Sequence, residues 1–198
     1  MMNRTSGETE YGTTSFRTAA SDRRVVPWLN GRGTTQVVAA TDQWRVSIAE
    51  EPTESRFSVI DGVDRLITPI GSVSLELIGP SFVSPPGSVD AVTVVRHVVE
   101  PLHTLAFPGE WAPASRASSR TRALNVMGRR GEVDMSVEIG PSEIPDRSGS
   151  VRICLDLVTE DALIVPPGEL MPPVPPRRCA IISISRTGPQ ALRVSSTD

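Results

Sequence analysis

The 198-residue sequence contains no lysine, and all 20 of its basic side chains are arginine. Without a lysine amine, Schiff-base chemistry and a lysine general base are excluded. A site for an anion would therefore use arginine, histidine or backbone N–H groups, and arginine is suited to bidentate contacts with carboxylates. The formal net charge is -3. Since nucleic-acid binding needs a basic surface, we expect no nucleic-acid partner.

Histidine and cysteine are also scarce. The two histidines, His97 and His103, have a proline between them, so a His-x-His site completed by a third histidine cannot be built. Cys154 and Cys179 form no Cys-x-x-Cys pair, and we expect buried free thiols. No Gly-x-Ser-x-Gly nucleophile elbow is present. The sequence therefore predicts no metal, no cofactor and no catalytic residue.

Long apolar runs are missing as well. No segment approaches the roughly 20 apolar residues that a membrane helix needs, and the N-terminus has no signal-peptide core. We therefore expect a cytoplasmic protein with no membrane partner. Residues 1–22 are rich in Thr, Ser, Gly and Glu, which predicts a disordered tail ahead of a single folded domain at 23–194.

Short β-prone runs, separated by glycine and proline, fill the rest of the chain. Several alternate between apolar and polar residues, which is typical of half-buried strands and predicts an all-β sandwich or barrel. A turn of helix is the only helical feature expected, at 114–120. The predicted strands are 35–40, 44–50, 57–60, 64–70, 73–78, 91–99, 104–107, 121–127, 132–139, 150–158, 162–165, 179–186 and 191–194.

Two motifs near the start contain candidate ligand-binding residues. In Pro27 to Thr35, Trp28 and Asn30 lie beside two glycines, which let a backbone approach a ligand closely. A glycine-rich turn with the tryptophan packed on the core is the alternative. In the run 44–50, alternation places Glu50 on the apolar face, either at a barrel mouth or paired with an arginine.

Two later motifs contain charged and amide side chains in apolar strands. Asp64 and Arg65 are adjacent, so their side chains point to opposite faces, and an inward Arg65 would need a ligand anion or a buried carboxylate such as Glu50. Alternation places Asn125 and Arg129 on one face, where a buried amide would need hydrogen-bond partners from a ligand or a loop.

Taken in order, these motifs resemble the HutD/Ves family. The resemblance rests on Pro-Trp-x-Asn-Gly-x-Gly-x-Thr, Trp-Arg-x-Ser-Ile-Ala-Glu, Gly-x-Asp-Arg, Phe-x-Gly-Glu and Asn-x-Met-x-Arg-Arg-Gly, which span about 27–131. It implies an all-β RmlC-like cupin fold, a double β-barrel (bicupin) in one chain. The segment from about 150 to 194 would then supply the closing strands of the second barrel.

The resemblance also implies a role. HutD is associated with histidine utilisation and is regarded as a regulatory protein that binds a pathway intermediate such as N-formylglutamate, without catalysing a reaction. We therefore expect a small anionic metabolite as partner, with Arg65, and Arg129 or Arg130, as anchors. Two alternatives stay open: a metal-free cupin enzyme with Glu50 or His103 as base, and a ligand-free scaffold with Arg65 paired internally. The oligomeric state is open, a homodimer included.

Overall fold

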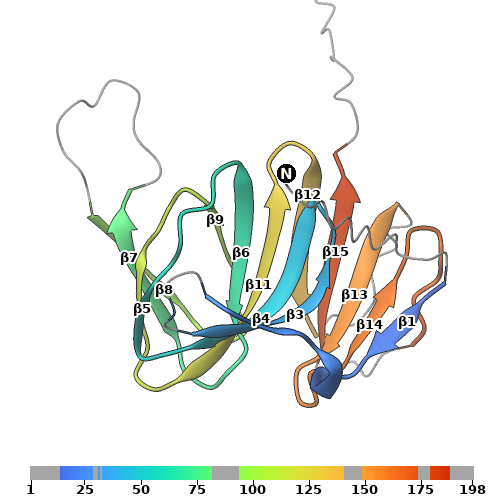
Figure 1. The fold of residues 1–198 in the computed structure, drawn as a ribbon, viewed down its shortest axis with the longest axis horizontal. Helices are drawn as coiled ribbons and strands as arrows, with labels where there is room; N and C mark the ends of the chain where they lie inside the picture. Colours follow the sequence, from blue (N-terminus) through green and yellow to red (C-terminus); the bar gives the residue numbers. More distant parts are fainter. Residues whose placement is uncertain are drawn as a thin grey trace, which may run out of the picture.

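The protein is built almost entirely of short strands (Figure 1). The computed structural model describes residues 14–28, 31, 33–81, 94–140, 149–173 and 179–187. Its only described helix is the 3-10 turn η1 (Ala20–Asp22). The strands are β1 (Phe16–Thr18), β2 (Val25–Pro27), β3 (Thr34–Ala40), β4 (Trp44–Glu51), β5 (Glu54–Arg56), β6 (Val63–Pro69), β7 (Leu75–Pro80), β8 (Val94–Val99), β9 (Leu105–Pro108), β10 (Ala114–Arg116), β11 (Thr121–Arg129), β12 (Val133–Ile139), β13 (Ser150–Asp156), β14 (Ala162–Val165) and β15 (Cys179–Arg186).

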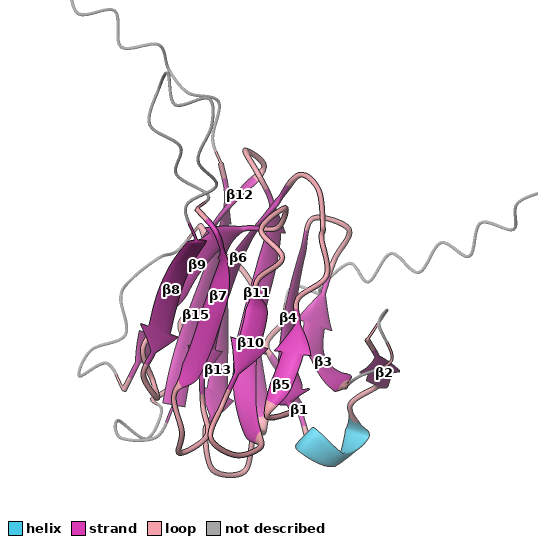
Figure 2. Ribbon diagram, turned by 90° about the vertical axis from the view of Figure 1, so that its left-hand side faces the viewer, coloured by secondary structure: helices cyan, strands magenta, loops and turns pink. Residues whose placement is uncertain are grey.

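The strands form three antiparallel sheets. Sheet A has the order β1-β14-β13-β15-β12, sheet B the order β2-β3-β4-β11-β6-β9, and sheet C the order β5-β10-β7-β8. Figure 2 shows sheet C in front of the strands of sheet B. The long strands β4 and β11 are paired over eight positions in the middle of sheet B. Both barrels of the molecule are therefore built on one central sheet.

One face of sheet B packs on sheet A and forms the larger hydrophobic core. Sheet B contributes Val46 and Ile48 from β4 and Leu124 and Val126 from β11. Sheet A contributes, among others, Ile153, Leu155, Ala162, Ile164, Ala180, Ile182 and Ile184. The alternating positions of each strand explain this core, because every second residue of a strand points to the same face.

The other face of sheet B packs on sheet C. Ile67 and Phe107 from sheet B meet Leu75, Leu77 and Val99 from sheet C in a second buried cluster. This cluster fills one part of the first barrel, and the cavity described below lies in another part.

Most of the predicted strands agree with the structure, and the all-β prediction is confirmed. Two local predictions were wrong. Residues 57–60 form no strand, because β5 ends at Arg56 and the chain then turns along the barrel mouth. The expected helical turn at 114–120 begins with strand β10, which pairs with both β5 and β7.

The N-terminal prediction also differs from the structure in part. Within the predicted tail 1–22, Phe16–Thr18 pairs with β14 as strand β1, and η1 follows. The rest of the tail up to residue 13, and the predicted strand 191–194, lie outside the described residues. Within the described residues, no helix is long and apolar enough to cross a membrane.

The shared core predicts that both barrels unfold together. Ile182 is fully buried between sheets A and B, so Ile182→Ala should leave a cavity and lower the free energy of unfolding by about 2–5 kcal/mol. Urea denaturation followed by circular dichroism should show one transition at a lower midpoint. The control Val158→Ala shortens the side chain of a residue that is 60% exposed and should change the midpoint little. Two separate transitions in Ile182→Ala would contradict a common core.

Candidate functional site

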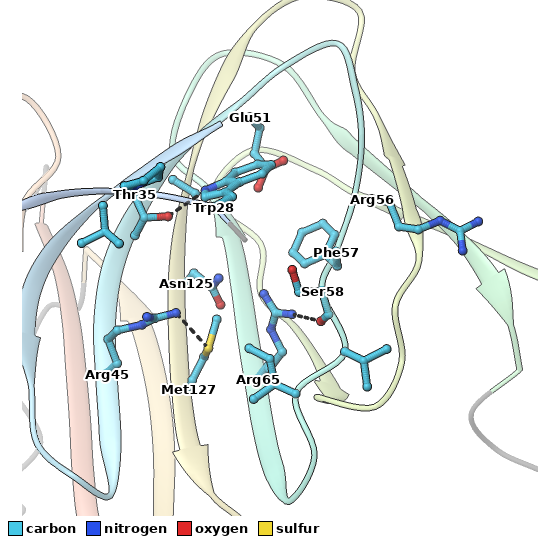
Figure 3. Close-up of a pocket in the computed structure, with 15 residues that line it drawn as sticks. Trp28, Thr35, Arg45, Glu51, Arg56, Phe57, Ser58, Arg65, Asn125 and Met127 are labelled. Carbon is cyan, nitrogen blue, oxygen red and sulfur yellow. Dashed lines mark hydrogen bonds between the residues drawn. The ribbon is translucent and has the colours of Figure 1, made fainter. Parts of the chain in front are cut away.

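A cavity of about 380 Å³ opens beside the hydrophobic cluster of the first barrel. Its floor is formed by strands β4, β6 and β11, and the segment after β5 forms one wall (Figure 3). Most of its lining is apolar, and the polar groups are few. The described residues that line it are Val26, Pro27, Trp28, Thr35, Arg45, Ala49, Glu51, Arg56, Phe57, Ser58, Val59, Ile60, Arg65, Asn125 and Met127.

The register of sheet B places two arginines on either side of a methionine. Arg45 on β4 and Arg65 on β6 are both cross-strand partners of Met127 on β11, so the three side chains form one row on the cavity side. Asn125 lies two residues before Met127 on the same face. Arg45 and Arg65 stand two strands apart, about 10 Å between backbones.

Arg65 is buried, and no carboxylate of the described residues is in contact with it. Its side chain is 3% exposed, and its guanidinium carbon lies 4.7 Å from the centre of the Phe57 ring and 5.2 Å from that of Phe107. Nη1 donates one hydrogen bond, of 3.4 Å, to the Ser58 carbonyl oxygen, while Nε is buried with no partner. Burial lowers the pKa of Arg65 to about 10, against the attraction of Glu51. The group stays charged at neutral pH and has unused donor capacity.

Two further polar groups in the cavity are incompletely hydrogen-bonded. Arg45 donates from Nη2 to the Met127 sulfur at 3.5 Å, but its Nε has no partner, and burial lowers the pKa of Arg45. The side-chain oxygen of Asn125 is likewise buried without a partner. Buried polar atoms are usually hydrogen-bonded, so unpartnered donors and an acceptor in one cavity are typical of a ligand site.

Glu51, the last residue of β4, is the carboxylate of this cavity. It is 2% exposed, and its nearest described polar partner is the Ser55 hydroxyl, which donates across 3.4 Å. Ser55 in turn lies 2.5 Å from the Ser115 hydroxyl. Burial raises the pKa of Glu51 to about 7, although Arg65 and Ser55 act in the opposite direction. The carboxyl group therefore changes charge near neutral pH.

The Trp28 indole is fixed at one side of the cavity by its turn. The Trp28 backbone N–H donates to the Gly33 carbonyl at 2.9 Å, and the indole Nε1 donates to the Thr35 hydroxyl at 2.8 Å. A Cβ at Gly33 would lie 2.9 Å from the indole ring, so the close approach requires glycine. Gly31 has a φ of 69°, which also favours glycine.

The structure brings three of the predicted site residues together and leaves two apart. Trp28, Arg65 and Asn125 line the cavity. Glu50 is exposed on the opposite face of β4, where its carboxylate lies 3.0 Å from Arg122, so Glu51 replaces it as the carboxylate of the cavity. Arg129 is exposed and lies 3.7 Å from Glu132.

Asn30 lies outside the described residues. Sequence reasoning missed Arg45 and Glu51. Every second residue of a strand points to the same face, so the series Arg45, Ser47, Ala49 continues to Glu51. This alternation is the signal by which the sequence could have predicted Glu51.

Three of the sequence motifs meet in a surface ion cluster instead of the cavity. Arg130 Nε donates to Asp64 at 2.8 Å, and its Nη2 donates to Glu110 at 2.7 Å and to the Val63 carbonyl at 2.9 Å. Glu110 also accepts from the Gly62 N–H at 2.9 Å. These hydrogen bonds lower the pKa of Glu110 to about 2 and raise that of Arg130. Arg130 thus holds loops together and is not available as an anion anchor.

The described residues contain no group of three or more His, Cys, Asp and Glu side chains placed to hold a metal ion. Cys154 and Cys179 are free, buried thiols on neighbouring strands of sheet A. His103 lies in the turn after β8, and its Nδ1 is 3.2 Å from the Pro101 carbonyl oxygen. None of these groups lines the cavity.

The fold and the cavity together define a two-barrel β-protein with an internal pocket. Two solved structures share this fold. HutD from Pseudomonas fluorescens SBW25 (formate condition) has a TM-score of 0.67 at 20% identity, and the match covers 88% of this chain and 100% of that one. The conserved protein of unknown function PA5104 from Pseudomonas aeruginosa PAO1 has a TM-score of 0.67 at 17% identity, with the same coverage.

The HutD family model matches residues 20–152. The chain belongs to the HutD family. The all-β fold predicted for it is confirmed, and its three sheets have the fold of the solved HutD structure. No protein with a curated description matches the sequence.

The raised pKa of Glu51 predicts a pH-dependent loss of stability. Because the folded state holds this proton up to about pH 7 while an unfolded carboxyl releases it near 4.5, stability should fall as the pH rises between these values. At about pH 8 the cost of ionised Glu51 is about 3 kcal/mol. Glu51→Gln should therefore raise the melting temperature by several degrees at about pH 8 and much less at about pH 5.

The matched control for this measurement is Glu50→Gln, which neutralises the adjacent but exposed carboxylate. Its melting temperature should differ from that of the wild type by a similar small amount at both pH values. A stabilisation by Glu51→Gln that is the same at both pH values would contradict the raised pKa.

Proposed function

We propose that this protein binds a small carboxylate metabolite in the cavity of its first barrel and acts as a non-enzymatic binding or regulatory protein of the HutD type. N-formylglutamate, an intermediate of histidine degradation, is the first ligand to test. The proposal includes a cytoplasmic location, in which the protein senses or buffers this metabolite.

The main support for the proposal comes from the burial and the incomplete hydrogen bonding of Arg65. A buried guanidinium is costly unless an anion or a full set of acceptors compensates it. Arg65 forms no ion pair with any described residue, and its Nε has no hydrogen-bond partner among them. Its guanidinium is stabilised by cation–π contacts with two aromatic rings. A ligand carboxylate next to Arg65 would supply both the missing charge and the missing acceptor.

The other walls of the cavity support the same class of ligand. Arg45 offers a second cation with an unpartnered Nε, and the Asn125 side chain can hydrogen-bond a polar group. Trp28, Phe57 and Met127 supply apolar surface for the body of a ligand. A volume of about 380 Å³ lies at the lower end of the range of small-molecule pockets.

The two alternatives from the sequence have less support. The enzymatic alternative needs Glu50 or His103 as a base beside the ligand, and neither residue lines the cavity. The scaffold alternative needs a filled barrel with Arg65 paired to a carboxylate inside it. The cavity and the incomplete hydrogen bonding of Arg65 favour binding over this alternative.

Calorimetric titration with N-formylglutamate, urocanate and glutamate tests the proposal. Arg65→Met keeps most of the side-chain volume and removes the charge, so it should weaken binding of a carboxylate by about 2–3 kcal/mol, roughly 30-fold to 150-fold. Arg129→Met is the matched control, because Arg129 is exposed and outside the cavity. It should leave the Kd unchanged.

Two outcomes would count against the proposal. If none of the three acids binds the wild-type protein at millimolar concentration, the named ligands are wrong. If Arg65→Met and Arg129→Met bind equally well, the ligand does not occupy the cavity that Arg65 lines.

A further inference from the structure

Glu51 is a carboxylate in the cavity that is proposed to bind an anion, and two negative charges there would repel each other. The inference starts from this repulsion. The residue is 2% exposed and shares the cavity with Arg45 and Arg65. A buried carboxylate repels an entering carboxylate unless it is protonated. We propose that Glu51 binds the ligand in its neutral acid form, so that the protein takes up a proton when an anion enters and selects ligands that carry a second hydrogen-bond acceptor. This inference rests on the proposed function.

The groups around Glu51 determine its charge in the empty cavity. From β6, Arg65 favours the ionised form, and the Ser55 hydroxyl on β5 donates to the carboxyl group. On β4 itself, Arg45 is a second cation of the cavity. On β11, the residue opposite Glu51 is Thr121, which is uncharged. Arg56 on β5 lines the rim, and its guanidinium points away from the other side chains in Figure 3.

An anion that binds Arg65 changes both forces that act on Glu51. It neutralises the cation that favours ionised Glu51, and it adds a negative charge in the same buried space. Both changes favour the protonated form. With a pKa near 7 in the empty cavity, Glu51 is mostly ionised at about pH 8 and mostly protonated at about pH 5.5. Proton uptake on binding should therefore be large at the higher pH and close to zero at the lower pH.

Neutral Glu51 also adds a donor to the site. A protonated carboxyl group presents one O–H donor, whereas the ionised group only accepts. A ligand with a carboxylate at Arg65 and a carbonyl or second carboxylate oxygen at Glu51 satisfies both groups. A ligand with an ammonium or N–H group at that end would instead keep Glu51 ionised.

Calorimetry in two buffers of different ionisation enthalpy measures the proton uptake directly. The probe is N-formylglutamate, whose carboxylates stay ionised above about pH 6. For the wild-type protein at about pH 8 we expect uptake of roughly 0.5 to 1 proton per ligand, and the Kd should tighten as the pH falls towards about 7. At about pH 5.5 the uptake should be near zero.

Two variants separate Glu51 from other titrating groups. Glu51→Gln keeps a side-chain amide that can still donate, so it should bind the probe with no proton uptake and a Kd that no longer depends on pH in this range. Glu50→Gln, on the opposite face of β4, should take up as many protons as the wild type.

The outcomes distinguish the inference from the function on which it rests. Absence of binding by the wild type would remove the proposed function, and the inference with it. Binding without proton uptake at about pH 8, with proton release, or with the same uptake in Glu51→Gln would overturn the inference alone. Binding that is lost in Arg65→Met while proton uptake disappears in Glu51→Gln would support both.

Discussion

Strands β4 and β11 border two different environments, and the rest of the molecule depends on keeping those environments apart. One set of alternate residues, including Ile48 and Leu124, packs on sheet A. The other set includes Arg45, Asn125 and Glu51 and faces the cavity. Because side chains alternate strictly, a shift of one residue in either strand would move charged groups into the main core. The eight-position pairing of these strands therefore secures the core and the cavity together.

The polar groups of the molecule perform two separate tasks. On the surface, Arg130 directs four hydrogen bonds to Asp64, Glu110 and the Val63 carbonyl, which join the turns after β9 and β11 to strand β6. In the cavity, Arg65 is buried with incomplete hydrogen bonding. The first arrangement stabilises the fold, whereas the second keeps a charge available at a cost in stability. Both arginines belong to motifs by which the family is recognised, so motif membership alone does not distinguish a binding residue from a structural one.

The sequence alone predicted the β-class, most of the strands and three cavity residues, for physical reasons that can be stated. Arg65 could be identified because a charged residue in an apolar strand has to point to one of two faces, and Asn125 by the same argument. Glu50 was proposed and Glu51 was missed because alternation defines two faces of a strand without showing which one borders a cavity. That depends on sheets A and C, which pack on opposite faces of sheet B. Arg129 lies outside the cavity because it is the last residue of β11 and is exposed.

The part of the chain that matches the family is shorter than the part that builds the hydrophobic core. The family match ends at residue 152, inside β13, while β14 and β15 extend to Arg186 and supply Ile164, Ile182 and other residues to the core on sheet B. A chain cut at the end of the match would leave Val46, Ile48 and Val126 uncovered by these strands. Strands β14 and β15 lie beyond the family match but cover the core of the matched part, so we expect a minimal folding unit to extend at least to the end of β15.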